Sequence, residues 1–403
     1  MTALRLAANP AVSPLFAARL LSSAGVGFGQ VALVWGMKDL GYSPSAISLV
    51  VACKGLPAVL ILAGGVLGDR FKRHHVLAAA ELLASVTWLA IGACLLTGHS
   101  SVPGLCVLAL MSGTAYFLFL PAVRGVTADL LPPDRRQAGN ALVGQTEATG
   151  LLIGLASAGI VVGSLGPAFA AGLKGGLSAL GLVLLLRLDA PRRVAGKPRP
   201  IADLGAGWAY FAAHRWMWMM TVQFTTVIMA TATFIEIIGP LYMSQHGHGA
   251  SEWGLVAAAE ALGALAGAAL ALRWKPHRPI FVAVSLLSLT ALPMMLVGSG
   301  APWTVVALGM LMSGVAKAVY LTLWITELQK ILPIETLARV NAWSIVPAYF
   351  MAPIALALSG RLVELDGPAS AAVVVGINVL LATTAVLLSR TWQPTERSSP
   401  TPQ

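Results

Sequence analysis

The chain alternates between long apolar segments and short polar loops that are rich in basic residues. A helix needs about 20 apolar residues to cross a bilayer, and segments of this length recur from one end of the 403-residue chain to the other. Because a helix satisfies its own backbone hydrogen bonds in lipid, the pattern predicts an all-α integral membrane protein with twelve transmembrane helices. The expected spans are 13–38, 44–68, 75–97, 102–127, 138–163, 166–187, 215–240, 251–272, 279–298, 302–328, 337–360 and 367–389.

The longest polar interval divides these spans into two sets of six. We expect an N-terminal six-helix half at 1–187, a cytoplasmic basic linker at 188–214, a C-terminal six-helix half at 215–389 and a cytoplasmic tail at 390–403. Two phrases recur in the same order in both halves: "LMSGTA" at Leu110–Ala115 returns as "LMSGVA" at Leu311–Ala316, and "LAGGVLGDRFKRH" at 62–74 returns as "LAGAALALRWKPH" at 265–277. A duplicated six-span unit gives two parallel repeats, which favours a midplane binding site between them.

Composition and charge agree with this topology. Hydrophobic residues make up 57% of the chain and charged residues only 10%, against about 25% in soluble domains. The net charge of +10 comes mainly from loops on one side of the predicted membrane. By the positive-inside rule this places both termini in the cytoplasm of a multi-pass protein in the plasma (inner) membrane. The partners expected are therefore the lipid bilayer and a small-molecule substrate, with no nucleic acid, and the protein is expected to be a monomer.

The predicted loop after the second span carries a recognisable motif, "GGVLGDRFKRHH". It resembles the corresponding loop of the major facilitator superfamily, with Gly65, Asp69, Arg70 and Arg73 at the matching positions. The resemblance implies twelve helices and a cytoplasmic gating motif whose charges bias the inward and outward states. The sequence of residues 32–70 and 120–142 is similar to that of drug and siderophore exporters of the macrolide-efflux and enterobactin-exporter type.

Two positions depart from patterns within that superfamily. Many proton-coupled members carry an arginine in span four where this chain has Ala109. Antiporters often show a glycine-rich motif in span five, of which Gly150, Gly154 and Gly159 are kept. The antiporter signature is therefore half retained, and export is expected on the wider resemblance.

Charged side chains inside the spans are the first candidates for function, because a charge in the bilayer is costly and usually faces a wet cavity or a partner. Lys317 in span ten is expected to be a substrate- or proton-linked residue, with an ion pair to Glu260 or Glu236 as the alternative. Glu236, Glu260 and Glu147 are candidates for proton coupling. A structural pair with a nearby base is the alternative for Glu260 and Glu147, whereas Glu236 could instead cap its helix.

Other polar and aromatic side chains give a second group of candidates. Lys54 in span two is expected to form a helix-packing ion pair. Aromatic rings with sparse polar groups suit an amphiphilic organic ligand, and ordinary packing is the alternative for each single residue. These substrate candidates are Tyr116, Trp35, Gln30, Gln223 and Trp324.

The sequence therefore predicts a secondary active transporter that exports small amphiphilic organic compounds, of drug, antibiotic or siderophore type, by proton-coupled alternating access. No GxxxxGK[ST] segment is present to bind ATP, so the proton gradient is the expected energy source and no cofactor or metal is expected. No catalytic cluster emerges, so the protein is not expected to be an enzyme. The alternatives are an importer of a small polar solute and a non-transporting membrane receptor or scaffold.

Overall fold

The computed structural model describes residues 9–60, 72–188, 208, 211–332 and 334–389, and within these it is helical and contains no strand. The first bundle consists of the helices that precede the basic linker. Their bounds are α2 Ser13–Asp39, α3 Pro44–Gly55 with a 3-10 turn at Leu56–Val59, α5 Arg73–Thr97, α6 Val102–Leu130, α7 Arg136–Leu165 and α8 Pro167–Leu186. A short 3-10 turn at Pro133–Arg135 leads from α6 into α7.

The second bundle repeats this plan with more interruptions. Its helices are α10 Arg215–Thr233, a π turn at Phe234–Ile238, α11 Gly239–Gln245, α12 Ala250–Arg273, α13 Pro279–Leu286, a 3-10 turn at Leu287–Ala291, α14 Leu292–Gly298, α15 Trp303–Ile331 and α16 Ile334–Leu388. α16 turns back on itself at Gly367, whose φ of 78° is left-handed and suits glycine.

The helices begin where local chemistry favours it. The hydroxyl of Ser43 accepts from the amide of Ala46 at 3.3 Å and that of Ser101 accepts from the amide of Gly104 at 3.2 Å, which caps α3 and α6. Pro167 follows at the first position of α8, where its missing N–H costs no helix hydrogen bond.

The predicted membrane architecture is confirmed. Ten helical stretches in the described residues are long and apolar enough to cross a membrane, and Pro44–Ala58 forms a shorter apolar helix. One of the ten, Trp343–Leu388, holds the last two predicted spans, because it contains the turn at Gly367. The second predicted span, 44–68, is described only as far as Leu60, so its full length stays a prediction, as do the domain boundaries and the linker at 188–214.

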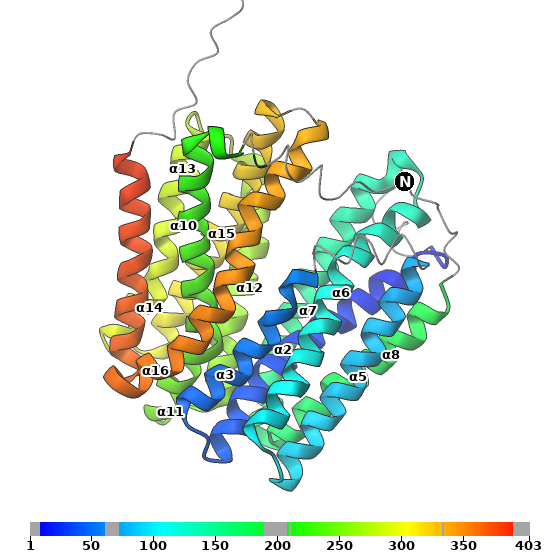
Figure 1. The fold of residues 1–403 in the computed structure, drawn as a ribbon, viewed down its shortest axis with the longest axis vertical. Helices are drawn as coiled ribbons and strands as arrows, with labels where there is room; N and C mark the ends of the chain where they lie inside the picture. Colours follow the sequence, from blue (N-terminus) through cyan, green and yellow to red (C-terminus); the bar gives the residue numbers. More distant parts are fainter. Residues whose placement is uncertain (1–8, 61–71, 189–207, 209–210, 333, 390–403) are drawn as a thin grey trace, which may run out of the picture.

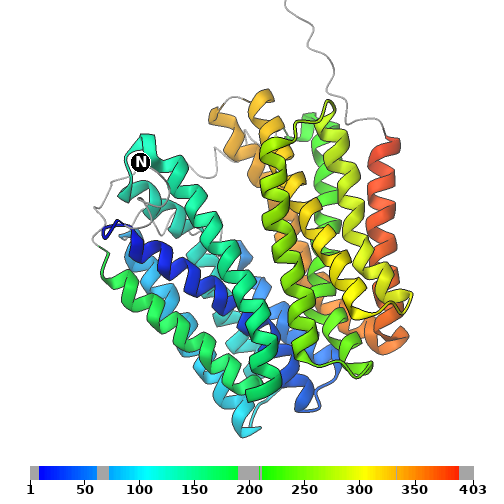
Figure 2. The same ribbon diagram turned by 180° about the vertical axis from the view of Figure 1, so that it is seen from behind.

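Figures 1 and 2 show the two bundles lying side by side, in contact at one end and diverging toward the other. We call the end at which α2 begins and α16 finishes the terminal end, and the end at which α2 is followed by α3 the far end. At the far end, a Cβ added to Gly254 of α12 would lie 2.8 Å from the Cα of Gly159 in α7. Backbone therefore meets backbone between the bundles.

Side chains join the bundles at the same end. The amide and hydroxyl of Ser45 in α3 donate to the two carboxylate oxygens of Glu364 in α16, at 2.9 and 2.6 Å. The hydroxyl of Ser48 donates to the carbonyl of Ala357 at 3.3 Å, and that of Ser251 donates to the carbonyl of Gly159 at 3.3 Å. The hydrogen bonds that join the two bundles at Ser45, Ser48, Lys54 and Ser251 all lie in the far half of the molecule.

The duplicated phrase has a structural explanation. A Cβ at Gly113 of α6 would overlap the carbonyl oxygen of Lys54 in α3, and a Cβ at Gly314 of α15 would overlap that of Glu260 in α12. Small residues let transmembrane helices approach this closely. Each glycine thus allows the backbone of a charged residue in the neighbouring helix to pack directly against it.

Candidate transport site between the bundles

One ion pair joins the two bundles inside the predicted membrane. The ammonium nitrogen of Lys54 in α3 lies 3.0 Å from Oε2 of Glu236, and about a quarter or less of each side chain is exposed. Glu236 lies in the π turn that follows α10. Pro240 cannot donate a backbone hydrogen bond to the carbonyl of Glu236, which accounts for the widened turn at this point. Lys54 therefore forms the ion pair between helices that the sequence led us to expect, and this pair joins helices of different bundles.

Lys317 pairs within its own bundle. Its ammonium group in α15 contacts the carboxylate of Glu260 in α12, and both side chains are largely buried. This is one of the two ion pairs that the sequence left open for Lys317. The pair neutralises two charges that would otherwise be costly in the membrane.

A third pair links two helices of the first bundle. The guanidinium of Arg19 in α2 lies 2.6 Å from Oε1 of Glu147 in α7, and it also lies over the ring of Phe119 at 5.3 Å. Arg19 is 3% exposed, whereas Glu147 is 44% exposed. The carboxylate therefore offers accessible negative charge beside a fixed positive one.

Aromatic side chains occupy the boundary between the bundles. Phe117 of α6 meets Tyr349 of α16 edge to face at 6.0 Å, and Tyr116 lies beside Phe117 at 5.3 Å. Tyr116 is 39% exposed, which is high for a tyrosine inside a span. Rings from both halves thus meet at this boundary.

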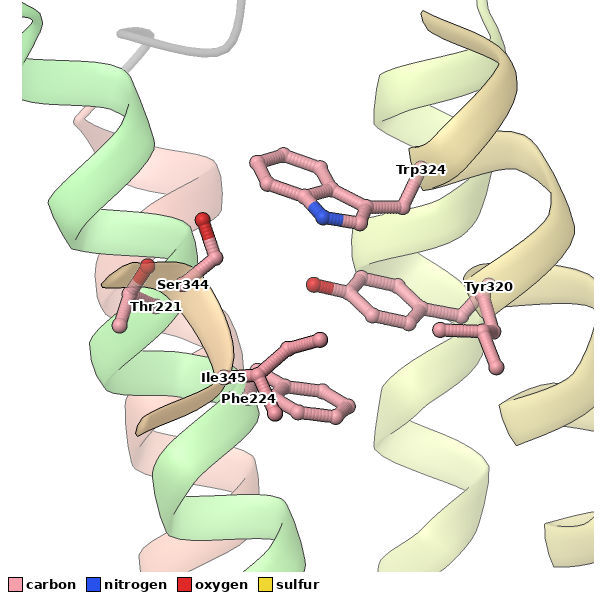
Figure 3. Close-up of a pocket in the computed structure, with 7 residues that line it drawn as sticks. Thr221, Phe224, Tyr320, Trp324, Ser344 and Ile345 are labelled. Carbon is pink, nitrogen blue, oxygen red and sulfur yellow. The ribbon is translucent and has the colours of Figure 1, made fainter. Parts of the chain in front are cut away.

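A second aromatic group lies in the C-terminal bundle. Tyr320 and Trp324 point from α15 toward Phe224 of α10 and toward Ser344 and Ile345 of α16 (Figure 3). The rings of Phe224, Tyr320 and Trp324 stack in sequence, with centroids 5.5 and 6.4 Å apart. The space between them is about 10 Å³, which is room for a single water.

The remaining substrate candidates are held by packing in this structure. Trp35 is 6% exposed in the apolar core, and Gln30 is partly buried on α2. Gln223 is fully buried, and its amide donates to the carbonyl of Val284 at 3.1 Å and to the hydroxyl of Thr383 at 3.0 Å. Gln223 thereby ties α10 to α13 and α16.

The gating motif is only partly described. Gly65, Asp69 and Arg70 lie outside the described residues. Arg73 lies at the start of α5, where its guanidinium donates to Asp129 of α6 at 3.2 Å and to the carbonyl of Gly125 at 3.4 Å. A charge contact between span ends is therefore present at the terminal end.

Two side chains inside the first bundle were not singled out from the sequence. Lys174 is the single cation of α8 and is 9% exposed, and Glu81 of α5 is 2% exposed. The signal for Lys174 was a lone charge in "AAGLKGGLSAL", in the middle of an otherwise uncharged span. In the described residues, no group of three histidine, cysteine, aspartate or glutamate side chains is arranged to hold a metal ion.

Comparison with known proteins agrees with this fold. The sequence model of the Major Facilitator Superfamily matches residues 15–356, so the chain belongs to this superfamily of membrane transporters. The chain is 26% identical over 386 residues to the enterobactin exporter EntS of Shigella boydii serotype 18, covering 94% of this chain and 92% of that protein. It is likewise 26% identical over 395 residues to EntS of Escherichia coli O1:K1 / APEC, with the same coverage.

Solved structures show the same architecture. The nucleoside transporter NupG superposes with a TM-score of 0.73 at 13% identity, covering 94% of this chain and 98% of that one. A bacterial homolog of the human lysosomal transporter Spinster, solved inward-facing and unoccupied, gives a TM-score of 0.71 at 15% identity and covers 95% and 98% of the two chains. At these identities the likeness concerns the fold.

Proposed function

We propose that this protein exports small amphiphilic organic compounds, of siderophore, antibiotic or drug type, by proton-coupled alternating access. Membership of the superfamily supports transport, and the similarity to enterobactin exporters along nearly the whole chain supports export. We further propose that it works as a monomer in the inner membrane, with the proton gradient as its energy source and without a cofactor.

The observation that carries the proposal is the position of the contacts between the bundles. They join at the far end, through Ser45 with Glu364 and Gly159 with Gly254, and the helices diverge toward the terminal end (Figures 1 and 2). The basic loops favour a cytoplasmic terminal end. With that orientation, the structure corresponds to an inward-facing state that receives a compound from the cell interior.

The chemistry between the bundles supports an amphiphilic ligand. Tyr116 and Tyr349 supply rings with a polar hydroxyl, and Glu147 supplies an exposed carboxylate fixed beside Arg19. A few oriented polar groups among aromatic rings give specificity for ring-containing compounds with polar substituents.

Export requires the far end to open, and this would separate α3 from the helices of the second bundle. The pair between Lys54 and Glu236 would then break, the ammonium group would need a new partner, and the carboxylate would need a new partner or a proton. Proton binding and ligand binding would each bias the two states through this exchange.

Purified protein in proteoliposomes tests the proposal. Fluorescent siderophores and amphiphilic dyes would be loaded, and their flux measured with and without an imposed pH gradient, against liposomes without protein and against vesicles with the gradient collapsed by an ionophore. We expect the compound to move in the direction opposite to the protons, and this flux to stop when the gradient is collapsed. Flux that ignores the gradient would refute proton coupling, and accumulation in step with proton entry would favour an importer.

A further inference from the structure

Glu81 is a buried carboxylate without an ion-pair partner in the described part of the chain. It lies on α5, is 2% exposed, and neither of its carboxylate oxygens has a hydrogen-bond partner among the described residues. By contrast, Glu147, Glu236 and Glu260 each contact a basic side chain. Leaving a buried carboxylate ionised and unpaired is costly, so this position differs in kind from the other three.

A cation that lines the same pocket points away from this carboxylate. Lys174 of α8 faces the same pocket, but its ammonium nitrogen lies over the ring of Trp88, 4.1 Å from the centroid. The indole N–H of Trp88 in turn donates to the hydroxyl of Ser112 at 2.8 Å, which fixes the ring. The ring attracts the cation by its quadrupole, so Lys174 has a resting place that does not depend on Glu81.

The pocket around Glu81 holds several polar side chains and has room for water. Its free space is about 30 Å³, which is enough for at least one water molecule. Ser22 of α2 and Ser178 of α8 place hydroxyls beside the carboxyl group, and Arg19 of α2 lies within electrostatic reach while paired with Glu147. Tyr116 of α6 lines the same pocket and is partly exposed. Its neighbour Phe117 meets Tyr349 of the second bundle, so one wall of the pocket lies close to the contact between the bundles.

We propose that Glu81 is a proton-binding site of the N-terminal bundle, with Lys174 as its movable counter-charge. Water in the pocket delivers the proton, an O–H bond forms on one carboxyl oxygen, and Lys174 stays on Trp88. When the proton leaves to water, the carboxylate and the ammonium group carry opposite charges, and Lys174 turns toward Glu81. The inference rests on the proposed proton coupling for its role in transport, but proton binding at Glu81 can be observed without transport.

Infrared difference spectroscopy of the purified full-length protein tests proton binding directly. The pH is changed across a film of reconstituted protein, and the C=O stretching band of protonated carboxyl groups is followed. We expect Glu81→Gln to remove one titrating carboxyl band and Glu81→Asp to keep a displaced one. Glu327→Gln, at the terminal end and paired with Lys330, is the matched control that leaves the band in place. An unchanged spectrum for Glu81→Gln in a protein that elutes and melts like the wild type would overturn the proposal.

A flux measurement tests the role in transport separately. In proteoliposomes, we expect Glu81→Gln to lose the acceleration by an imposed pH gradient and to keep exchange of labelled for unlabelled substrate across the membrane. Lys174→Met should displace the midpoint of the carboxyl band. If wild-type flux itself ignores the gradient, the proposed coupling fails while the infrared result still decides whether Glu81 binds a proton. If Glu81→Gln retains gradient-driven flux, the role of this site in coupling is refuted.

Discussion

Lys54 of the first bundle and Glu236 of the second form an ion pair with 3.0 Å between nitrogen and oxygen. The ion pairs of Arg19 with Glu147 and of Lys317 with Glu260 each stay within one bundle. A motion of one bundle against the other would therefore strain the first pair and leave the other two intact.

One reporter can follow this motion in several variants. Leu40 and Ser299 are exposed at the far end, one in each half. With the three native cysteines replaced by alanine, spin labels at Leu40→Cys and Ser299→Cys would give a distance distribution for the far end. A short distance reports the joined state seen here, and a long one reports opening.

Removing the pair between the bundles should open the far end. Glu236→Gln leaves Lys54 without its counter-charge, and we expect the joined state to lose about 2 kcal/mol, which is about 30-fold in the equilibrium. The label distance should shift toward the longer population. The charge-exchanged double variant Lys54→Glu with Glu236→Lys should restore the short distance, and failure of Glu236→Gln to change the distribution would contradict the role of this pair.

The pair between Lys317 and Glu260 should act on stability more than on conformation. Lys317→Met leaves a buried carboxylate without a partner, and we expect a loss of about 3 kcal/mol in the free energy of unfolding. Combining it with Glu260→Gln removes the charge and should recover most of that loss, as measured by thermal unfolding in detergent. A variant Lys317→Met with wild-type stability but no flux would instead assign Lys317 to the substrate.

The backbone contact at the far end should not tolerate a methyl group. A Cβ at Gly254 would lie 2.8 Å from both the Cα of Gly159 and the carbonyl oxygen of Leu155, and backbone atoms cannot move aside. We expect Gly254→Ala to lengthen the label distance and to reduce flux. Gly144→Ala is the matched control on α7, since its Cβ would meet open space and alanine favours the helix by up to about 1 kcal/mol. Equal behaviour of the two variants would contradict this account.

Acid on the far side should loosen the joined state. Hydrogen bonds from the hydroxyl and then the amide of Ser45 hold the pKa of the Glu364 carboxyl below its usual value. A pKa that is lower in the joined state means that the contact is fully formed above the ordinary glutamate pKa and is lost as the pH falls through the lowered one. The label distance should therefore lengthen at acid pH in the wild type. Ser45→Ala should lengthen it at neutral pH and weaken the response to acid; a wild-type distance independent of pH would contradict the prediction.

The sequence predicted the spans well because hydropathy along the chain is enough to locate the segments that lie in the bilayer. The ninth span was expected at 279–298, and the structure places helical residues at Pro279–Gly298. The second span and the gating residues Asp69 and Arg70 cannot be compared over their full length, because they lie partly or wholly outside the described residues.

The partners of the charges could not be predicted in the same way. Lys54 and Glu236 are 182 residues apart, and hydropathy gives the depth of each but not the direction in which its helix faces. The same limit explains why Trp35 was expected at a substrate site although its ring packs in the apolar core, and why Lys174, whose ammonium group lies over the ring of Trp88 on another helix, was not singled out. Only the packing of helices in three dimensions turns these side chains toward one another.

The equivalent glycines Gly113 and Gly314 support ion pairs of different kinds in the two halves. Gly113 fixes the backbone of Lys54, and Gly314 fixes that of Glu260, in the same relation of helix to helix. From these equivalent backbone positions, the side chain of Lys54 reaches the opposite bundle, whereas that of Glu260 pairs within its own bundle. The duplicated scaffold therefore holds an ion pair between the bundles in one copy and an ion pair within a bundle in the other, so that separating the bundles would break the first pair and spare the second.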